Sequence, residues 1–456
     1  MKKESYMFQI TEKEVEKADR LDVFFYNPEF MLNDKKLNLC KYKLEKFGNL
    51  IEFMTDGKHG GWNFVNKGIL FIRNTNIKDN EIDLKDVKYI SKEDHETIPR
   101  AHLQTGDLLF TSIGSVGVSA VVTKSIAGAN MNQNLVRIVL NRDKVVPEYV
   151  SIFLNSELGR SQSERHSTGN IQKIINYPAL KQFLIPLPPI SIQNKIIKSI
   201  NEINGKKRKN EKKILEIKKG LIEKFLNTTN LNLIKEIERK MYVSKIEDRF
   251  DPYFYNPKFT NNLKYITNSK NKIVKLSECG DIINESSFTE NINYKYIQIQ
   301  DINEETNEIV SYKIINKSNA PSRAKMIIKK GDILLPTLGG CLDSSAIVTK
   351  DYENQFASNG FAVIRINDAS LRDFIFFYIT TKFAKYQIEQ KLSGAIMASI
   401  SKKDIGDIIV PLPTKEKIKK FSILLEETRK RIKKINEDNE KTKMIIEKKV
   451  ESFLLK

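Results

Sequence analysis

The sequence is poor in cysteine and tryptophan, and it lacks a long apolar run. Of 456 residues, three are Cys and one is Trp. The cysteines, Cys40, Cys279 and Cys341, lie far apart, which predicts ordinary reduced thiols of a cytoplasmic protein rather than a disulfide scaffold or a zinc site. Without a run of about 18 apolar residues, a membrane-spanning protein is not expected. The opening Met-Lys-Lys-Glu-Ser also lacks the apolar core of a signal peptide.

Motifs of common enzyme classes are missing as well. A phosphate-binding loop would read Gly-x4-Gly-Lys-Ser/Thr, and the sequence has none. The pieces that begin Asn27-Pro28 and Asn256-Pro257 lack the second proline expected in an amino-methyltransferase, and they predict turns. The four histidines show no zinc-ligand spacing. We therefore expect no catalytic and no metal-binding residue, although a nuclease site assembled in space from distant carboxylates stays open.

Charge of one sign dominates the chain. Lys and Arg total 76 against 57 Asp and Glu, so the formal net charge is +19. Clustered cations attract polyanions and release the counterions of phosphates, which favours a nucleic-acid partner. With 40% hydrophobic residues, the chain is expected to fold into globular domains.

An internal repeat divides the sequence into halves. Four landmarks recur in the same order and at nearly constant spacing: Asp22 with Asp251, Gly106-Asp107 with Gly331-Asp332, Val136-Arg137-Ile138 with Ile364-Arg365-Ile366, and Pro186-Leu187-Pro188 with Pro411-Leu412-Pro413. Each copy first mixes short strand patterns with one helix, which starts at Pro147 in the first copy and carries Val150, Phe153, Leu154 and Leu158 on one face. A long helical segment without proline follows.

Both long segments show apolar residues at alternating steps of three and four. The predicted seam contains Ile196, Ile200, Ile203, Ile214, Ile217 and Leu221 in the first, and Leu425, Ile432, Ile435 and Ile446 in the second. A helix of about 38 residues is about 57 Å long, which favours pairing with the other helix over packing on its own domain. We expect an α+β fold: two similar mixed α/β domains separated by a pair of long antiparallel helices, with a pseudo-twofold repeat.

The expected domains are residues 1–188 for the first globular domain, 189–240 for the first long helix and a linker, 241–413 for the second globular domain, and 414–456 for the second long helix. A spacer of about 57 Å covers roughly 1.7 turns of duplex DNA. Two basic domains at its ends could read two short half-sites with unread bases between them. Because the domains differ in detail, the half-sites should differ in sequence.

The sequence resembles the specificity subunit of type I DNA restriction–modification systems. The resemblance is carried by residues 68–77, 106–117 and 185–189 with Gln193, and is echoed by residues 296–302, 331–340 and 410–413. It implies two target recognition domains that bind double-stranded DNA, and helices that dock two methyltransferase subunits, joined by motor-nuclease subunits. S-adenosylmethionine, ATP and magnesium would then belong to the partners, with no cofactor in this chain. The second copy departs from the pattern at Cys341-Leu342-Asp343, where the first has Ser115-Val116-Gly117.

Candidate DNA contacts are polar and basic residues expected on exposed loops. In the first half they are Lys58, Arg73, Asn74, Ser112, Arg165, Ser167, Thr168, Asn170, Gln172 and Lys173; in the second half they are Gln298, Gln300, Ser393, Ser399, Ser401, Lys402 and Lys403. The loops near Gly169 and Gly394 are favoured, because the two glycines occupy equivalent positions in the repeat.

The leading interpretation is a non-catalytic DNA-recognition subunit that selects a bipartite target for partner subunits. A self-contained restriction or modification enzyme with an unrecognised active site is an alternative, and so is a specificity module of a methylation-only system. A scaffold that uses its long helices only for interaction is a further alternative.

Overall fold

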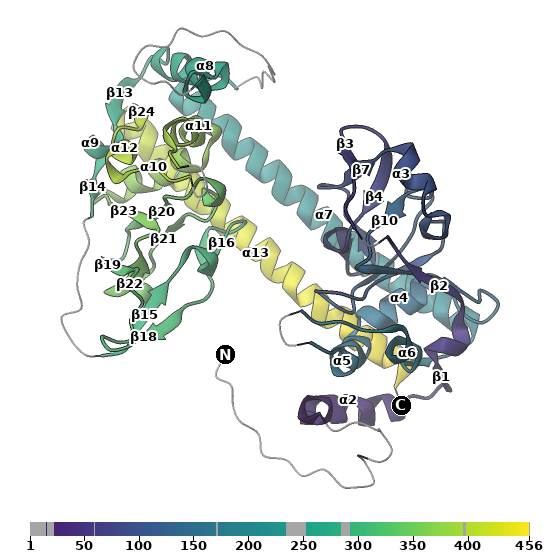
Figure 1. Ribbon diagram of the computed structural model, residues 1–456. Coiled ribbons are helices and arrows are strands. Elements are labelled where there is room, and N and C mark those ends of the chain that lie inside the picture. Colours follow the sequence, from purple (N-terminus) through teal and green to yellow (C-terminus); the bar gives the residue numbers. More distant parts are fainter. Residues whose placement is uncertain are drawn as a thin grey trace. The chain divides into compact units, whose positions relative to one another are not determined.

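The computed structural model describes residues 15, 22–58, 60–169, 172–233, 252–283, 292–394 and 398–455. The chain forms two compact units (Figure 1). The first comprises residues 1–211 and 436–456, and the second comprises residues 212–435. Two 40-residue helices, α7 (Ile190–Thr229) and α13 (Lys415–Leu454), each contribute one end to each unit.

The first unit mixes short helices and strands. Its helices are α2 (Pro28–Asn38), α3 (Lys92–Glu96), α4 (Pro147–Asn155), α5 (Glu157–His166) and α6 (Tyr177–Lys181), with 3-10 turns η1 (Val23–Tyr26), η2 (Phe47–Leu50), η3 (Asn74–Asn76) and η4 (Pro99–Ala101). Its strands are β1 (Leu44–Lys46), β2 (Ile51–Asp56), β3 (Phe64–Val65), β4 (Ile69–Ile72), β5 (Ile77–Lys78), β6 (Glu81–Ile82), β7 (Lys88–Ile90), β8 (Leu108–Thr111), β9 (Ser119–Val121), β10 (Asn130–Met131), β11 (Leu135–Leu140) and β12 (Leu184–Pro186).

The central sheet of this unit has the strand order β2-β11-β8-β9 and is antiparallel. All of β8 is buried, so its run Leu108-Leu109-Phe110 faces core on both sides. Val136 lies opposite Asp56, and Leu135 lies opposite Thr111. The ends of β2 and β8 and the start of β11 therefore meet at one edge, which we call the loop end of the sheet. A second sheet has the order β10-β4-β7-β3.

The helical part of the first copy differs from the sequence-based expectation. Leu158, expected on the same helix as Val150, belongs to the separate helix α5. The helix breaks at Ser156, which has an extended backbone and accepts a hydrogen bond from the Gly159 N–H through its hydroxyl (3.5 Å). Such N-caps start a new helix. The second copy has the same break at Thr381, so each copy carries two helices where one was predicted.

The second unit repeats this plan. Its helices are α8 (Pro257–Thr267), α9 (Leu276–Cys279), α10 (Ala369–Thr380), α11 (Lys382–Lys391) and α12 (Lys402–Gly406), with η5 (Pro252–Tyr255), η6 (Ile299–Asp301), η7 (Gly339–Cys341) and η8 (Lys350–Tyr352). Its strands are β13 (Lys272–Lys275), β14 (Asp281–Ile282), β15 (Tyr294–Ile297), β16 (Ile302–Asn303), β17 (Glu308–Ile309), β18 (Lys313–Ile315), β19 (Ala324–Ile328), β20 (Ile333–Pro336), β21 (Ala346–Ile347), β22 (Gln355–Ser358), β23 (Phe361–Arg365) and β24 (Ile409–Leu412).

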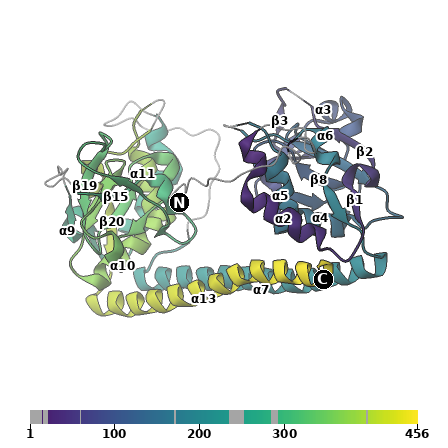
Figure 2. The same ribbon diagram turned by 90° about the horizontal axis from the view of Figure 1, so that it is seen from below.

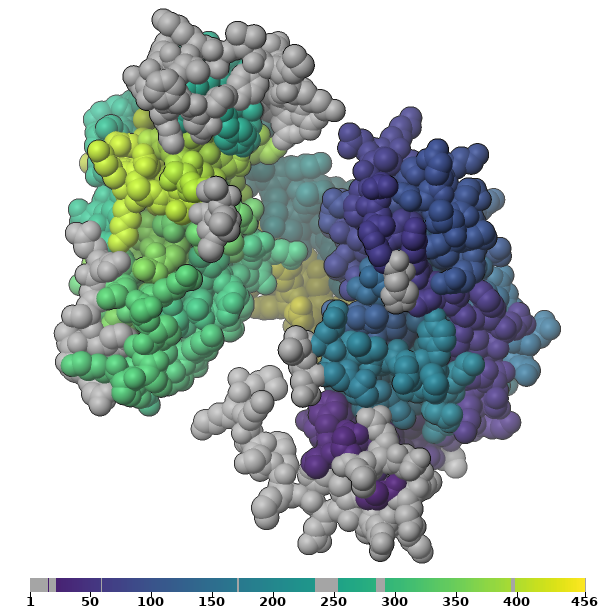
Figure 3. Space-filling model, viewed as in Figure 1, coloured from purple at the N-terminus to yellow at the C-terminus, as the bar shows by residue number. Residues whose placement is uncertain are grey.

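The sheets of the second unit follow the orders β14-β23-β20-β21 and β18-β15-β22-β19. In the space-filling view the atoms of the β15–β18 region form part of the visible surface of this unit (Figure 3). The side chains of Tyr312 and Ile314, in and just before β18, are exposed.

Equivalent packing in the two copies is visible in paired side chains. The buried Asp107 accepts a hydrogen bond from Nε of Arg137 at 2.6 Å, and Asp332 accepts from Nε of Arg365 at 2.8 Å. Gln162 bonds both backbone groups of Leu184, and its counterpart Gln387 does the same with Ile409. The internal repeat read from the sequence is therefore a structural repeat as well.

The two long helices run antiparallel within each unit (Figure 2). In the first unit Ile196 and Ile200 share a core with Val450 and Leu454. In the second unit the Phe225 ring lies 5.6 Å from the Phe421 ring. The predicted fold class is thus confirmed: two similar mixed domains, each followed in sequence by a long helix that pairs with the other.

Burial along the helices follows the heptad rhythm. The seam positions are buried or half-buried, namely Ile196, Ile200, Ile203, Ile214, Ile217 and Leu221 on α7, and Leu425, Ile432, Ile435 and Ile446 on α13. Polar residues occupy part of this seam. Asn210 donates a hydrogen bond through Nδ2 to Oδ1 of Asn439 at 2.9 Å, inside the first unit.

Candidate nucleic-acid interface

Three loops meet at the loop end of the first central sheet. The loop after β8 is tied to residues 173–175 by backbone bonds: Gly114 donates to the carbonyl oxygen of Lys173, and Ile175 donates to that of Ser112, both at 2.9 Å. Ile174 forms bridges with both Ile113 and Thr168. The two segments are distant in sequence, yet they form one small structural frame.

Gly114 lies at the centre of this frame with φ +87°, a conformation that favours glycine. A Cβ atom at this position would lie 3.6 Å from Nδ2 of Asn74 and 3.8 Å from Nε2 of Gln172. Asn74 comes from η3, so a third segment joins the cluster. Gln172 is exposed and Asn74 is half-buried. Within the part of the chain that the structure describes, neither side-chain amide has a hydrogen-bond partner.

Two cations accompany this end of the sheet. Lys58 follows β2 and forms a bridge with Asn132, and its ammonium lies 5.5 Å from the Trp62 ring centroid. The Lys173 ammonium lies 5.2 Å from the Phe24 ring centroid. Trp62 also packs at 4.6 Å on the Phe71 ring, so one face of the indole belongs to the core while a cation sits near it. Such aromatic contacts hold a lysine near a defined position.

Other sequence-based candidates are engaged inside the first unit. Arg165 donates through Nε to the carbonyl oxygen of Phe25 at 2.9 Å, stacks 4.0 Å over that ring and pairs with Asp34. Its side chain therefore attaches α2 to α5. Ser167 is buried and donates to Glu164, and Thr168 donates weakly across its loop.

Arg73 and Ser112 also have internal partners. Arg73 donates to the Asp86 carbonyl oxygen at 2.6 Å and to the Asp86 carboxylate at 2.9 Å. Ser112 is buried and its hydroxyl lies 3.3 Å from the Asn134 carbonyl oxygen. Both residues support the loops from behind. Asn170 lies outside the described residues.

The second unit builds the same frame at the equivalent positions of the repeat. Gly339 donates to the Ala398 carbonyl oxygen at 3.0 Å, and Ser399 forms bridges with Leu338 and Ser393. Gly394 has φ +110°, matching the φ of +97° at its counterpart Gly169. The pairing of these two loops, inferred from spacing, corresponds to equivalent backbone geometry.

The remaining candidates of the second unit surround this frame. Gln300 is exposed, whereas Gln298 precedes η6 and its backbone N–H donates to the Asp301 carboxylate at 2.8 Å. Ser401 caps α12 by accepting from the Asp404 N–H at 3.1 Å. Lys402 donates to the Ile283 carbonyl oxygen at 3.3 Å. Lys403 is exposed.

The two frames carry different residues at their tips. Ile299 stands at the position that Asn74 holds in the first copy. Where the first copy has Ser115-Val116-Gly117, the second forms the turn η7, followed by the buried Leu342 and by Asp343, which pairs with Lys385. The sequence departure at Cys341-Leu342-Asp343 thus corresponds to a differently built loop.

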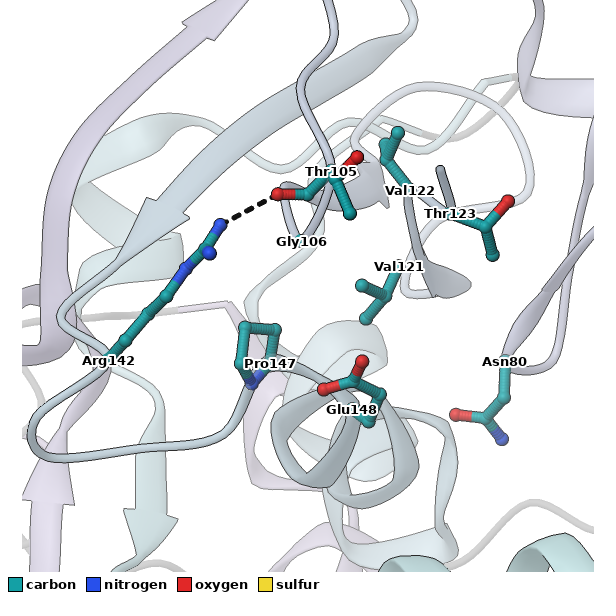
Figure 4. A pocket seen from close by; sticks show the side chains of 9 residues that line it. All are labelled: Asn80, Thr105, Gly106, Val121, Val122, Thr123, Arg142, Pro147 and Glu148. Atoms are coloured by element: carbon teal, nitrogen blue, oxygen red, sulfur yellow. Dashed lines mark hydrogen bonds between the residues drawn. The ribbon is translucent and has the colours of Figure 1, made fainter. Parts of the chain in front are cut away.

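A hollow of about 330 Å³ lies at the opposite end of β8 (Figure 4). It is lined by Asn80, Thr105, Gly106, Val121, Val122, Thr123, Arg142, Pro147 and Glu148. Arg142 crosses one side and donates to the Thr105 carbonyl oxygen at 2.8 Å. Because Thr105 and Gly106 precede β8, the hollow is separate from the loops that follow the strand.

Among the residues that the structure describes, no group of three or more His, Cys, Asp or Glu side chains is placed to hold a metal ion. Nor does any helix among those residues have the length and apolar character needed to cross a membrane.

The type I restriction–modification DNA specificity domain matches the chain twice, over residues 55–219 and 268–443. The chain belongs to this family. Each match contains one of the two loop frames and part of the long helix that follows it in sequence. The resemblance drawn from the sequence is therefore confirmed.

Individual members of the specificity family are only distantly similar. The type I restriction enzyme EcoBI specificity subunit of Escherichia coli is 29% identical over 139 residues, which is 30% of this chain and 29% of the relative. A provisionally named MjaX specificity subunit of Methanocaldococcus jannaschii is 24% identical over 407 residues, covering 87% and 88% of the two chains. A solved S subunit from M. genitalium is 12% identical, with a TM-score of 0.44 over 91% of this chain and 97% of that one.

Proposed function

We propose that this chain is a non-catalytic specificity subunit that binds a bipartite, asymmetric DNA target and directs partner subunits to it. The observation that supports the proposal is the pair of loop frames. Each presents a glycine-centred loop tied to a second loop by the same backbone bonds, with different side chains at the tip. Equal frames with unequal tips suit two recognition modules that read different half-sites.

Partner subunits would supply the chemistry. Two methyltransferase subunits would bind S-adenosylmethionine, and motor-nuclease subunits would bind ATP and magnesium. The long helices offer surfaces for docking, because large apolar side chains are exposed on both units. Leu215 and Ile222, one heptad apart on α7, are 54% and 43% exposed in the second unit; Met444 and Ile445 on α13 are 62% and 51% exposed in the first. Exposed apolar side chains on both units suit docking of one methyltransferase subunit to each.

Methylation mapping in cells with and without this gene tests the proposal. Deletion should abolish methylation of one two-part motif with an unspecified spacer, and re-expression of the full chain should restore it. Unchanged methylation in cells that express the partner subunits would contradict the proposal.

A domain exchange provides the matched control. Replacing residues 1–188 by the corresponding segment of another family member should change one half-site only, and replacing residues 241–413 should change only the other. A change in both half-sites after either exchange would argue against independent reading.

The competing interpretations give other outcomes. If the purified chain alone, with S-adenosylmethionine and magnesium, cleaved or methylated DNA, the enzyme hypothesis would replace this one. If deletion removed methylation and no restriction of unmodified DNA could be measured, a methylation-only system would be favoured. If the assembled complex bound DNA without sequence preference, the scaffold interpretation would stand.

A further inference from the structure

The side-chain amides of Asn74 and Gln172 beside Gly114 make no hydrogen bond to the described residues that support the loop. Asn74 and Gln172 arrive from segments far apart in the sequence, and both side-chain amides flank the same glycine. The backbone that carries Asn74 is fixed from behind, because Asn76 accepts from the Arg73 N–H at 3.0 Å and donates to the Asp83 carbonyl oxygen at 3.0 Å. A rigid support with an unpaired polar end is the arrangement expected of a recognition side chain.

The chemistry of these groups selects among base pairs. A carboxamide offers a hydrogen-bond donor and an acceptor side by side. Adenine presents the matching acceptor and donor, N7 and N6, at its major-groove edge, so Asn and Gln favour adenine. Gly114 has no side chain to hold a base away from the amides. The neighbouring Lys173 places a cation where a phosphate would help to orient the duplex.

The second unit lacks this pair. Ile299 and Met397, neither of which carries an amide, stand at the positions of Asn74 and Gln172. The position of Lys173 is taken by Ala398. A Cβ at Gly339 would lie 2.5 Å from Cδ1 of Leu392, so the corresponding glycine faces an apolar side chain. The amide-lined loop is therefore a property of the first unit.

We propose that Asn74 and Gln172 read adenine, at the same or neighbouring base pairs, in the half-site that the first unit recognises. The inference rests on the proposed function and adds to it which side chains read an A·T pair of the first half-site. Arg165, Arg73 and Ser112 act as positioning residues, since each makes a side-chain hydrogen bond to a backbone carbonyl oxygen within the first unit.

The test uses the full chain with its partner subunits and reads the methylated motif. Asn74→Ala combined with Gln172→Ala should make one or two A·T positions of the first half-site degenerate. Discrimination against a G·C pair there should fall by about 5- to 150-fold, the range of one good bidentate contact. The second half-site should stay unchanged.

Isosteric variants sharpen this test. Asn74→Asp with Gln172→Glu keeps size and removes the amide donors, and carboxylates accept from the N4 amino group of cytosine. The preference at the affected position should move from adenine toward cytosine. Because the shape is kept, this variant decides the matter if the double alanine variant fails to fold.

Gln104→Ala is the matched control. Gln104 is an exposed amide in the turn before β8, at the far end of the strand from Gly114. It should leave the motif unchanged. The proposal is overturned if both double variants keep the wild-type motif, if the relaxed position is a G·C pair, if it falls in the second half-site, or if binding weakens equally for all sequences.

Failure of this inference and failure of the proposed function give separate results. If deletion of the gene leaves methylation unchanged, the proposed function fails. If deletion abolishes the motif and the amide variants restore it fully, only the assignment of Asn74 and Gln172 fails.

Discussion

In both copies a side chain of the second domain helix, α5 or α11, donates to a backbone carbonyl oxygen just before the first helix, α2 or α8. An ion pair between the two helices accompanies this bond, but its residues differ. In the first copy Arg165 of α5 donates to the Phe25 carbonyl oxygen, and in the second Gln390 of α11 donates to the equivalent oxygen of Phe254 at 2.9 Å. In the first copy the cation, Arg165, lies on α5 and its partner Asp34 lies on α2. In the second copy the cation, Lys258, lies on α8 and pairs with Glu389 of α11 at 2.8 Å.

Lys258 also shows how the second copy compensates for burial. Burial lowers the pKa of its ammonium, but the hydrogen bonds to Glu389 and Tyr253 outweigh this and leave the pKa above its ordinary value. The comparison teaches that the side-chain hydrogen bond to this carbonyl oxygen is kept in both copies, while the ion pair beside it is built from different residues. The same division applies to the loop frames, whose backbone bonds match and whose tips differ.

Removing the buried carboxylate of the Asp–Arg ion pair should give the largest difference in lost stability between the two units. Asp107→Ala leaves Arg137, with a side chain only 8% exposed, without its partner, and should cost about 3–5 kcal/mol of unfolding free energy. Asp332→Ala should cost about 1–3 kcal/mol, because Arg365 is 27% exposed and water can solvate it. Trp62 is the one tryptophan of the chain and lies in the first unit, so its fluorescence during urea unfolding reports that unit.

Lys43→Ala is the control for Asp107→Ala. Lys43 is 78% exposed and pairs with Glu45, so its loss should cost at most about 1 kcal/mol. Hydrogen exchange reports the second unit. A larger loss of unfolding free energy in the second unit of Asp332→Ala than in the first unit of Asp107→Ala would contradict the comparison.

The hydrogen-bonded pair Asn210 and Asn439 in the helix seam tests whether these polar residues lower the stability of the first unit while fixing the register of the helices. Asn210→Leu alone leaves Asn439 without its partner and should cost about 1–2 kcal/mol. Adding Asn439→Leu should recover that loss, since apolar residues suit a heptad seam. Urea unfolding followed by Trp62 measures both, with the exposed Lys209→Ala as control. Additive losses in the double variant would show that the two amides do not interact.

Replacing the equivalent glycines Gly114 and Gly339 by alanine should destabilise the two loop frames to different extents. Gly114→Ala forces a side chain into a backbone with φ +87° and should cost about 1–2 kcal/mol. Gly339→Ala requires only that Leu392 change rotamer, which should cost about 0.5–1.5 kcal/mol. Hydrogen exchange of residues 112–117 and 337–341 reads each loop in the same sample.

Gly205→Ala provides a control of opposite sign. Gly205 lies inside α7 with open space around it, so alanine should stabilise the helix by about 0.5–1 kcal/mol. We expect the larger increase in exchange at residues 112–117 of Gly114→Ala. A larger increase at residues 337–341 of Gly339→Ala would contradict this prediction.

The smallest difference should be a pH dependence confined to the first unit. Burial, and next the stacked His102 ring at 3.6 Å, lower the pKa of His95. The folded unit therefore binds a proton less readily than the unfolded chain, and its stability should fall as the pH drops from about 7.5 to about 5.5. All four histidines precede Asn170, so the second unit should lack this component.

The measurement is Trp62-detected unfolding at several pH values, with hydrogen exchange following the second unit. Replacing His102 by Gln removes one cause of the shift and should flatten the dependence. An equal slope in wild type and in this variant would assign the effect to other groups.

Much of the frame could be predicted from the sequence, because it depends on residues with restricted backbone roles. Gly169 and Gly394 both need a positive φ, and their spacing matches the spacing of the β8 and β20 motifs. The long helices were predictable because a heptad pattern is a local property that does not depend on remote partners. Ser156, by contrast, hid a helix break inside a continuous apolar pattern.

Assignment of the loop residues could not be completed from the sequence. Arg165 stands in a basic, hydroxyl-rich segment that suits DNA, yet its partner Asp34 comes from a distant helix and takes up its charge. Asn74 was predicted from the sequence as a DNA contact at a strand end, but only the fold places it beside Gly114. Contacts between residues far apart in the sequence decide which polar side chains remain available to DNA. The local sequence around each residue does not contain this information.

The end of α13 has a consequence for synthesis on the ribosome. Val450 and Leu454 are buried in the core of the first unit, and Lys41 donates to the Leu454 carbonyl oxygen at 3.0 Å. These residues are translated after the whole second unit. The first unit thus emerges early but is completed late, and the apolar faces of Ile196 and Ile200 must wait for their partners while the second unit is synthesised. Chaperones that bind exposed apolar segments would meet this chain during that interval.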